Sequence, residues 1–389
     1  MGDTFDVGVI GASGLGSAAA CHLAQRGVKV LVLDQFEPAH PHGGSQDVSR
    51  IIRFAYHDIA YTQLLPLAYD AWRALEDASS ISLLTRTGGL DLAFALGPHV
   101  RWIDLYADSM SGAEIAFEML DSAEVRYRFP QFQFDADVRA VYQHDTSIID
   151  AARAIVVHLS MARRLGATVL HNTKVKQIRP RGHDLVIETV NRDFVVNKLV
   201  VAAGAWADSL VEPLGASIGL TVTQEQVTYY ATPFLEEYSV GRFPFFQWHD
   251  EEFFYAFPIH GEVATKIGID AAGPIVTPET RTYEIDPVRE RRVEVWLERY
   301  VPGFLGPKLL SKTCLYDMPR DRDLVLDALP DIPNVVICCG AGHGFKFAPL
   351  SGRVAADLAL DGYTSVPIER FRINRPAIED ASQKSSFRI

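Results

Sequence analysis

Several features are scarce in this 389-residue chain, and each scarcity excludes a class of protein. Four cysteines are too few for a disulfide scaffold, so we expect the chain to fold in a reducing compartment. Lysine and arginine (37) are outnumbered by aspartate and glutamate (49), and the net charge of −12 disfavours nucleic acid and anionic membranes as partners. No run approaches the roughly 18 consecutive apolar residues that a membrane helix needs. The apolar fraction of 48% is instead typical of a globular protein of about two or three domains.

The N-terminal sequence resembles no targeting segment. It enters a predicted strand at Asp6 without the basic region and the long apolar region of a secretory signal. We therefore expect a cytoplasmic protein.

Residues 5–34 have the pattern of a βαβ unit: two short apolar runs flank an alanine-rich segment with apolar residues at helical spacing. Between the first run and the helix lies the turn Gly11-Ala12-Ser13-Gly14-Leu15-Gly16, and the second run ends in Asp34. Such a turn lets backbone N–H groups approach a pyrophosphate, and a carboxylate about 20 residues further on can bind the ribose hydroxyls. Because Ser13 replaces the middle glycine of the G-x-G-x-x-G fingerprint, the residues alone predict a dinucleotide and leave FAD and NAD as alternatives.

The rest of the chain alternates between helical and strand-like patterns. We expect helices at residues 61–75 and 152–165, and strands at residues 168–170, 175–178, 185–190 and 194–196. The apolar run at 199–204 predicts a strand that rejoins the first sheet, and residues 334–360 predict a further strand, glycine turn and helix.

These patterns predict an α/β fold in which a Rossmann-like nucleotide-binding domain is interleaved with a β-sheet-rich substrate domain. We assign residues 1–85, 150–216 and 319–389 to the first domain and residues 86–149 and 217–318 to the second. Aromatic residues crowd together in the second domain around residues 243–257. They are either plain core or the wall of a hydrophobic pocket.

Six short motifs follow one another along nearly the whole chain. They are Ser49-Arg50-Ile51-Ile52-Arg53-Phe54-Ala55-Tyr56, Ala203-Gly204-Ala205-Trp206, Lys266-Ile267-Gly268, Cys314-Leu315-Tyr316, Gly342-His343-Gly344-Phe345-Lys346-Phe347 and Ile373-Asn374-Arg375-Pro376-Ala377. Together with the βαβ unit, they resemble the monomeric sarcosine oxidase family of flavoprotein amine oxidases, which includes N-methyltryptophan oxidase and pipecolate oxidase. The resemblance implies a glutathione reductase/p-hydroxybenzoate hydroxylase-like fold, a monomer, and no metal.

The resemblance also implies covalently bound FAD, with a thioether from Cys314 to the 8α carbon of the flavin. Judged without this context, Cys314 would be a packed small hydrophobe. Attachment requires a thiolate and a flavin that holds negative charge, so Arg50 and the backbone N–H groups of residues 342–347 are expected near its pyrimidine end. The remaining residues expected to contact FAD are Gln46, Ser49, Val175, Ala203, Gly204, Trp206, Gly342, His343, Gly344, Phe345 and Lys346.

The implied reaction is the oxidation of a secondary amino acid. A hydride equivalent leaves the carbon next to the nitrogen, water hydrolyses the imine, and two electrons pass to O₂ to give hydrogen peroxide. Arg53 and Lys346 are expected to bind the substrate carboxylate, Lys266 to activate oxygen, and Tyr255 to line the pocket. Surface charge is the ordinary alternative for Arg53 and Lys346, and plain core for Tyr255.

Two positions depart from the family pattern and leave the substrate open. Asp270 and Gln46 stand where sarcosine oxidases carry histidines. An acid at position 270 is similar to the fructosyl amino acid oxidases, so Asp270 either engages a substrate ammonium or sugar hydroxyl or forms an ion pair with Lys266. A flavin dehydrogenase with another acceptor and a non-catalytic or NAD-dependent nucleotide-binding protein are the remaining alternatives.

Overall fold

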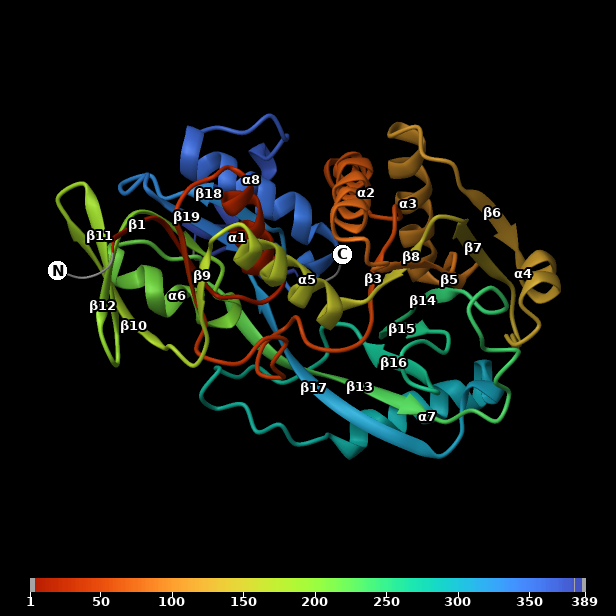
Figure 1. Ribbon diagram of the computed structural model, residues 1–389. Coiled ribbons are helices and arrows are strands. Elements are labelled where there is room, and N and C mark those ends of the chain that lie inside the picture. Colours follow the sequence, from red (N-terminus) through yellow and green to blue (C-terminus); the bar gives the residue numbers. More distant parts are fainter. Residues whose placement is uncertain (1–3, 381, 387–389) are drawn as a thin grey trace.

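The computed structural model describes residues 4–380 and 382–386. Its first sheet has eight strands and is built around the N-terminal βαβ unit (Figure 1). Strand β1 (Thr4–Ile10) pairs in parallel with β2 (Val30–Leu33) and β12 (Asp193–Val201). Every residue of β2 is buried, as is typical of a parallel strand covered on both faces. The other strands of this sheet are β9 (Thr168–Leu170), β10 (Val175–Arg181), β11 (Asp184–Thr189), β18 (Val325–Ala328) and β19 (Val335–Cys339).

Three helices form a layer beside this sheet (Figure 1). Helix α1 (Gly14–Gln25) packs against both α5 (Ala151–Arg164) and α8 (Ala348–Asp361). The contact between α1 and α8 depends on Gly352, because a Cβ there would lie 2.5 Å from the backbone carbonyl carbon of Ala18. Close packing of α1 and α8 fixes the turns that precede them, and both turns face the cavity described below.

The second sheet also has eight strands, in the order β17-β13-β16-β15-β14-β5-β7-β6. Its strands are β5 (Gly89–Phe94), β6 (Glu118–Asp121), β7 (Val138–Gln143), β13 (Thr221–Tyr230), β14 (Phe245–His249), β15 (Phe253–Phe257), β16 (Thr265–Ile269) and β17 (Lys308–Met318). The long strands β13 and β17 pair along their length and extend from the first sheet toward α7 (Pro287–Tyr300) (Figure 1).

A small third sheet, β3-β8-β4, carries part of the site. Its strands are β3 (Arg50–Ile52), β4 (Leu84–Arg86) and β8 (Ser147–Ile149). The remaining α-helices are α2 (Ile59–Ser79), α3 (Arg101–Gly112), α4 (Ser122–Arg128), α6 (Ala207–Val211) and α9 (Pro376–Glu379). Short 3-10 helices span Pro98–Val100, Gly204–Trp206, Glu212–Leu214, Pro302–Phe304, Gly344–Phe347 and Glu369–Phe371.

The predicted α/β fold is confirmed, and so is the strand that rejoins the first sheet, because β12 pairs with β1 in parallel. Two details were predicted wrongly. The segments 194–196 and 199–204 were expected as two strands, but one strand, β12, runs through both and ends at residue 201. Helix α7 lies within residues 217–318, where strands were expected. Among the described residues, no helix has the length and apolar character needed to cross a membrane.

Candidate active site

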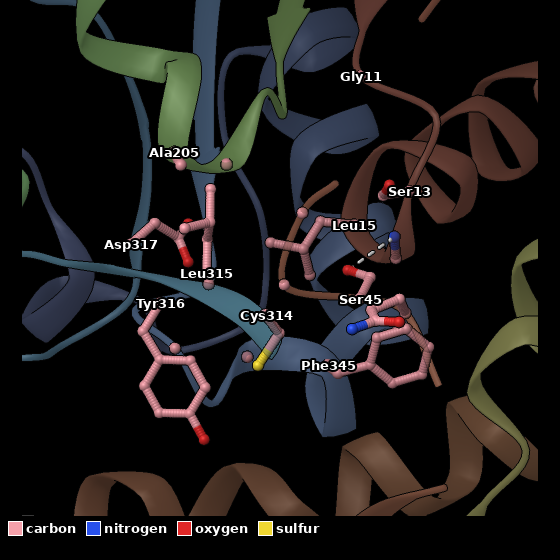
Figure 2. A pocket seen from close by; sticks show the side chains of 18 of the residues that line it. Gly11, Ser13, Leu15, Ser45, Ala205, Cys314, Leu315, Tyr316, Asp317 and Phe345 are labelled. Atoms are coloured by element: carbon pink, nitrogen blue, oxygen red, sulfur yellow. Dashed lines mark hydrogen bonds between the residues drawn. The ribbon is translucent and has the colours of Figure 1, made fainter. Parts of the chain in front are cut away.

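A cavity of about 510 Å³ lies between the two large sheets and receives residues from all three sheets. One end is lined by the β1–α1 turn and by Asp34. The other end is lined by charged side chains from β3, β16 and the segment after β19. Figure 2 shows part of the lining, with Ser13 and Ser45 on one side, Tyr316 and Asp317 on the other, and Cys314 between them.

The β1–α1 turn has the geometry of a phosphate-binding loop. Gly11 has a φ of +96°, and a Cβ there would lie 2.3 Å from the carbonyl oxygen of Ala202. A Cβ on Gly14 would lie 2.7 Å from the ring of Phe345, so this surface admits backbone only. The Ser45 hydroxyl accepts a hydrogen bond from the Gly14 N–H at 3.3 Å. The turn therefore presents a bare backbone at the start of α1, where an anion is favoured.

Asp34 directly follows β2 and is held in place by two backbone groups. Its Oδ2 accepts from Ala12 N–H at 2.7 Å, and its Oδ1 accepts from Phe36 N–H at 2.9 Å. His40 lies 3.7 Å from the same carboxylate. Each carboxylate oxygen keeps a further lone pair that can accept a hydrogen bond from a ribose hydroxyl.

Gly16 is the one predicted cofactor-binding residue that does not line the cavity. It is buried within α1, and a Cβ there would lie 1.9 Å from the carbonyl oxygen of Gly11. Gly16 therefore shapes the turn without lining the cavity, because its missing Cβ lets α1 approach Gly11 closely.

Cys314 lies on β17 with its side chain in the cavity, near Tyr316 and Phe345 (Figure 2). Burial raises the pKa of the Cys314 thiol, and the positive charge of Arg50 opposes this rise. Arg50 is held by the carbonyl oxygens of Ser49 and Gly44, to which it donates at 2.9 and 2.8 Å. The guanidinium is thus close enough to act on the charge of the sulfur, and its expected place at the pyrimidine end of FAD stays a prediction.

Lys266 projects from β16 and is buried, with its side chain 3% exposed. Its ammonium donates to the carbonyl oxygen and to the hydroxyl of Ser49, each at 3.0 Å. It also lies 2.7 Å from Oδ2 of Asp47. Burial lowers the pKa of Lys266 to about 8, although the charge of Asp47 raises it.

Arg53 follows β3 and forms a buried ion pair that the sequence did not reveal. Its Nη1 donates to Oδ1 of Asp91 on β5 at 2.9 Å, and the two side chains are 5% and 2% exposed. His249 lies 3.3 Å from the same carboxylate oxygen. Burial opposes the charge of Arg53, but Asp91 raises the pKa of the guanidinium overall.

Asp270 pairs with Arg322, which corrects the expected alternative of a pair with Lys266. The two Nη atoms of Arg322 donate to the two carboxylate oxygens at 2.7 and 2.8 Å. This two-pronged geometry suits a guanidinium, whereas the ammonium of Lys266 is taken by Asp47. Burial would raise the pKa of Asp270, but the charge and hydrogen bonds of Arg322 lower it.

Lys346 lies in the 3-10 helix before α8 and is buried. Its ammonium donates to the hydroxyl of Tyr56 at 2.7 Å and to the carbonyl oxygen of His343 at 3.3 Å. Within residues 4–380 and 382–386, no carboxylate forms an ion pair with it. Burial, together with the charges of Arg53 and Arg322, lowers its pKa well below the ordinary value. An anion entering the cavity would therefore favour the protonated ammonium, whose charge no carboxylate among the described residues pairs with.

The aromatic cluster around residues 243–257 proves to be both core and cavity wall. Phe245 on β14 and Tyr255 and Phe257 on β15 line the cavity, whereas their neighbours Phe246 and Phe254 lie in a separate hydrophobic core. This follows from strand geometry, because successive side chains point to opposite faces.

Comparison with known proteins shows which protein family the chain belongs to. The sequence profile described as "FAD dependent oxidoreductase" matches residues 6–358. The chain is 31% identical to a monomeric sarcosine oxidase of Bacillus sp. (strain B-0618) over 100% of both chains. The chain belongs to the FAD-dependent oxidoreductase family. The predicted resemblance to the monomeric sarcosine oxidases is thereby confirmed.

The chain is also similar to two further proteins. It is 28% identical to an N-methyl-L-tryptophan oxidase of Salmonella agona, over 95% of this chain and 99% of the relative. The solved structure of NikD, an unusual amino acid oxidase essential for nikkomycin biosynthesis, superposes with a TM-score of 0.86 at 26% identity, over 95% of this chain and 97% of that one.

The cavity fits the cofactor that defines the FAD-dependent oxidoreductases. The turn at Gly11 and Gly14 leaves room for a pyrophosphate only because Cβ atoms are absent, and Asp34 is placed for a ribose. The thiol of Cys314 lies further along the same cavity, where an isoalloxazine ring would follow. Residues of this chain that would hold FAD therefore come from several segments that are far apart in the sequence.

Apart from Gly16, the structure brings every predicted site residue to this one cavity. Sequence reasoning missed Asp47, Asp91 and Arg322. Arg322 lies in the charged run from Arg320 to Asp323, which has the composition of a solvated turn, and the sequence carries no sign that it is 1% exposed.

Proposed function

We propose that the protein is an FAD-dependent oxidase of secondary, N-substituted amino acids. Bound FAD supplies the acceptor for two electrons from the carbon next to the substrate nitrogen and passes them to O₂; water hydrolyses the imine, and the products are a dealkylated amine, a carbonyl compound and hydrogen peroxide. The observation that carries the proposal is the convergence of a thiol, an uncompensated ammonium and a buried guanidinium on one cavity, in Cys314, Lys346 and Arg53.

The charges at the inner end of the cavity favour one substrate carboxylate. Arg53 pairs with Asp91 and Arg322 with Asp270, so these four charges cancel. Protonation of Lys346, which a bound carboxylate favours, then adds one positive charge. A carboxylate bound at Lys346 would bring this sum to zero. Arg53 then acts as a second donor whose direction is fixed by Asp91.

The same charges assist the amine. A substrate amine gives up a hydride equivalent only in its unprotonated form. The nearby cations Arg53, Arg322 and Lys346 disfavour a further positive charge on that amine. Tyr255 and Phe257 add apolar surface that excludes water from this region.

Lys266 is proposed to act in the oxidative half of the reaction. A buried ammonium stabilises the negative charge that develops on oxygen as the first electron arrives. Exchange of Lys266 for methionine is expected to leave anaerobic reduction by substrate intact and to slow reoxidation by orders of magnitude. Stopped-flow absorbance separates the two steps.

Attachment of FAD through a thioether at Cys314 is part of the proposal. The position of the sulfur in the cavity and the charge of Arg50 beside it support this attachment. Mass spectrometry of the denatured chain should find a flavin adduct on the peptide with Cys314 and none in a Cys314→Ser variant. A purified wild-type protein that releases all of its flavin on acid precipitation would contradict the attachment.

We also propose that residues 1–85, 150–216 and 319–389 form the FAD-binding domain and residues 86–149 and 217–318 the substrate domain. The strands of the first large sheet come from the first set of segments, and those of the second large sheet from the second set. A monomer in the cytoplasm is proposed from the names of the monomeric sarcosine oxidases and from four free, buried cysteines.

The substrate is tested by a peroxide assay against sarcosine, larger N-methyl amino acids, pipecolate, proline and fructosyl amino acids. We expect turnover of at least one N-substituted amino acid and none of the corresponding amine without a carboxylate. Turnover confined to fructosyl amino acids would assign Asp270 to a sugar hydroxyl. Flavin reduction without peroxide would indicate a dehydrogenase with another acceptor.

A further inference from the structure

A buried carboxylate that no sequence motif indicates lies against Lys266. Asp47 directs Oδ2 to the Lys266 ammonium at 2.7 Å, while its Oδ1 lies 3.0 Å from the ammonium of Lys312. The hydroxyl of Tyr229 donates to the same Oδ1 at 2.6 Å. The side chains of Asp47 and Lys266 are each 3% exposed, so solvent screens their interaction little.

The backbone of Asp47 is strained. Its φ of +103° lies in the region that favours glycine, so a residue with a side chain is unfavourable there. Such strain persists where surrounding contacts hold the residue in place, and it is common at functional sites. The contacts of the carboxylate with Lys266, Lys312 and Tyr229 provide that hold.

The groups that face Lys266 come from several elements, and cations predominate among them. Arg50 of β3 lowers the pKa of the Lys266 ammonium. Burial, together with the charge of Lys266, in turn lowers the pKa of His260, which lies in the loop before β16. Tyr229 of β13 and Phe257 of β15 present their rings at 5.8 and 4.6 Å. Lys312 and Cys314 face the same space from β17, and the thiol is no longer titratable once it forms a thioether. With Asp47 neutral, Lys266 would face Arg50 and Lys312 without its carboxylate partner.

We propose that Asp47 is a positioning residue for oxygen reduction: its carboxylate keeps the Lys266 ammonium charged and fixed against Ser49 inside the cavity. This inference rests on the proposed role of Lys266 in oxygen activation. Burial alone favours the neutral amine, and Asp47 opposes it by attraction at a distance of 2.7 Å. The same Oδ2 lies 3.9 Å from the guanidinium of Arg50, and the effect proposed for oxygen reduction is the one that the carboxylate exerts through Lys266.

The first test compares the two half-reactions of the holoenzyme in Asp47→Asn. Lys266 is charged below its pKa, so reoxidation by O₂ should slow as the pH rises through that value. Loss of the nearby anion should move this decline to lower pH by about one to three units. Between the pH of the decline in Asp47→Asn and that in the wild-type protein, the variant should be reoxidised about tenfold more slowly than wild type for each pH unit that separates the two declines. Acidification should restore its rate. Anaerobic reduction by substrate should be unchanged.

Two further variants separate this effect from misfolding. Asp47→Gly removes the carboxylate and also relieves the strain at a φ of +103°, so it should fold even where the asparagine variant does not. Glu290→Gln is the matched control, because Glu290 is a buried carboxylate that pairs with Lys308 at 2.9 Å, against β17 but outside the cavity. It should leave the pH profile of reoxidation unchanged.

A direct readout follows the ammonium of Lys266 itself. In oxidised holoenzyme labelled with ¹⁵N-lysine, the Nζ resonance of Lys266 is the one missing from Lys266→Met, and its pH titration gives the pKa. We expect a lower pKa in Asp47→Asn and Asp47→Gly than in the wild-type protein and in Glu290→Gln. This measurement does not depend on turnover.

The outcomes distinguish the inference from the proposed function beneath it. If Lys266→Met slows reoxidation but both Asp47 variants keep the wild-type pH profile and lysine titration, the role of Asp47 is overturned and that of Lys266 stands. If Lys266→Met leaves reoxidation unchanged, both roles fall. Reduction slowed as strongly as reoxidation in the Asp47 variants would also overturn the inference.

Discussion

The two ends of the cavity are built on opposite principles. The end at the β1–α1 turn consists of backbone N–H groups, glycines and Asp34, all within residues 11–34. The inner end consists of buried cations and their carboxylate partners, drawn from β3, β5, β16 and the segments after β17 and β19. The first end is shaped by the absence of side chains, the second by their charges.

This difference explains what each end can bind. A pyrophosphate brings its own charge and needs only close approach of a backbone and the field of a helix N-terminus. A substrate carboxylate needs cations, and cations buried without partners destabilise a protein. The chain meets both demands by pairing Arg53 with Asp91 and Arg322 with Asp270, and by leaving Lys346 without a carboxylate among the described residues.

The largest effect is expected from adding a methyl group at the backbone end. Gly11→Ala places a Cβ 2.3 Å from the carbonyl oxygen of Ala202, whereas Gly166→Ala, at the same φ of +96°, meets no atom within 4 Å. Gly166→Ala should cost about 1 kcal/mol of unfolding free energy and keep its flavin. Gly11→Ala should be purified without flavin. Flavin content and thermal unfolding are measured for both variants. Equal flavin content and equal stability would show that the close approach of Gly11 to Ala202 does not shape the turn.

At the charged end, Arg53→Met should leave Asp91 buried without its cation. Breaking a buried pair in this way should lower the unfolding free energy by about 3–5 kcal/mol. The double variant Arg53→Met/Asp91→Leu should regain most of that stability but should not regain substrate affinity. Denaturant unfolding and KM are the measurements. A double variant that binds substrate normally would remove Arg53 from the site.

A smaller effect is expected at Lys346. Its pKa lies well below the ordinary value, so raising the pH removes its proton, and KM should increase with pH. Binding of an unreactive substrate analogue should take up a proton, because the carboxylate favours the charged ammonium. Lys346→Met should raise KM about tenfold or more, as expected for losing a hydrogen bond to a charged group, and should flatten this pH dependence. A KM that keeps the wild-type pH dependence in Lys346→Met would assign the titration to another group.

The sequence was most informative where the structure is local. The turn at Gly11, the carboxylate of Asp34 and the strand before Gly204 could be predicted because helix and strand periodicity and one short motif describe them. The inner end could be predicted only through resemblance to a family, and only for the residues in its motifs.

The residues that escaped prediction share a physical reason. Asp47, Asp91 and Arg322 are charged residues that become buried through partners far away in the sequence, such as Lys266 for Asp47 and Asp270 for Arg322. Charge in a sequence ordinarily indicates exposure, and no local pattern shows a partner that lies 38 or more residues away.

The most direct test of the account is to mix the purified protein with an N-methyl amino acid in the absence of oxygen and then to admit oxygen. The account predicts that the visible absorption of flavin bleaches in the first step and returns in the second, with one equivalent of hydrogen peroxide for each flavin reoxidised. A flavin-containing protein that no N-substituted amino acid on the panel bleaches would contradict it.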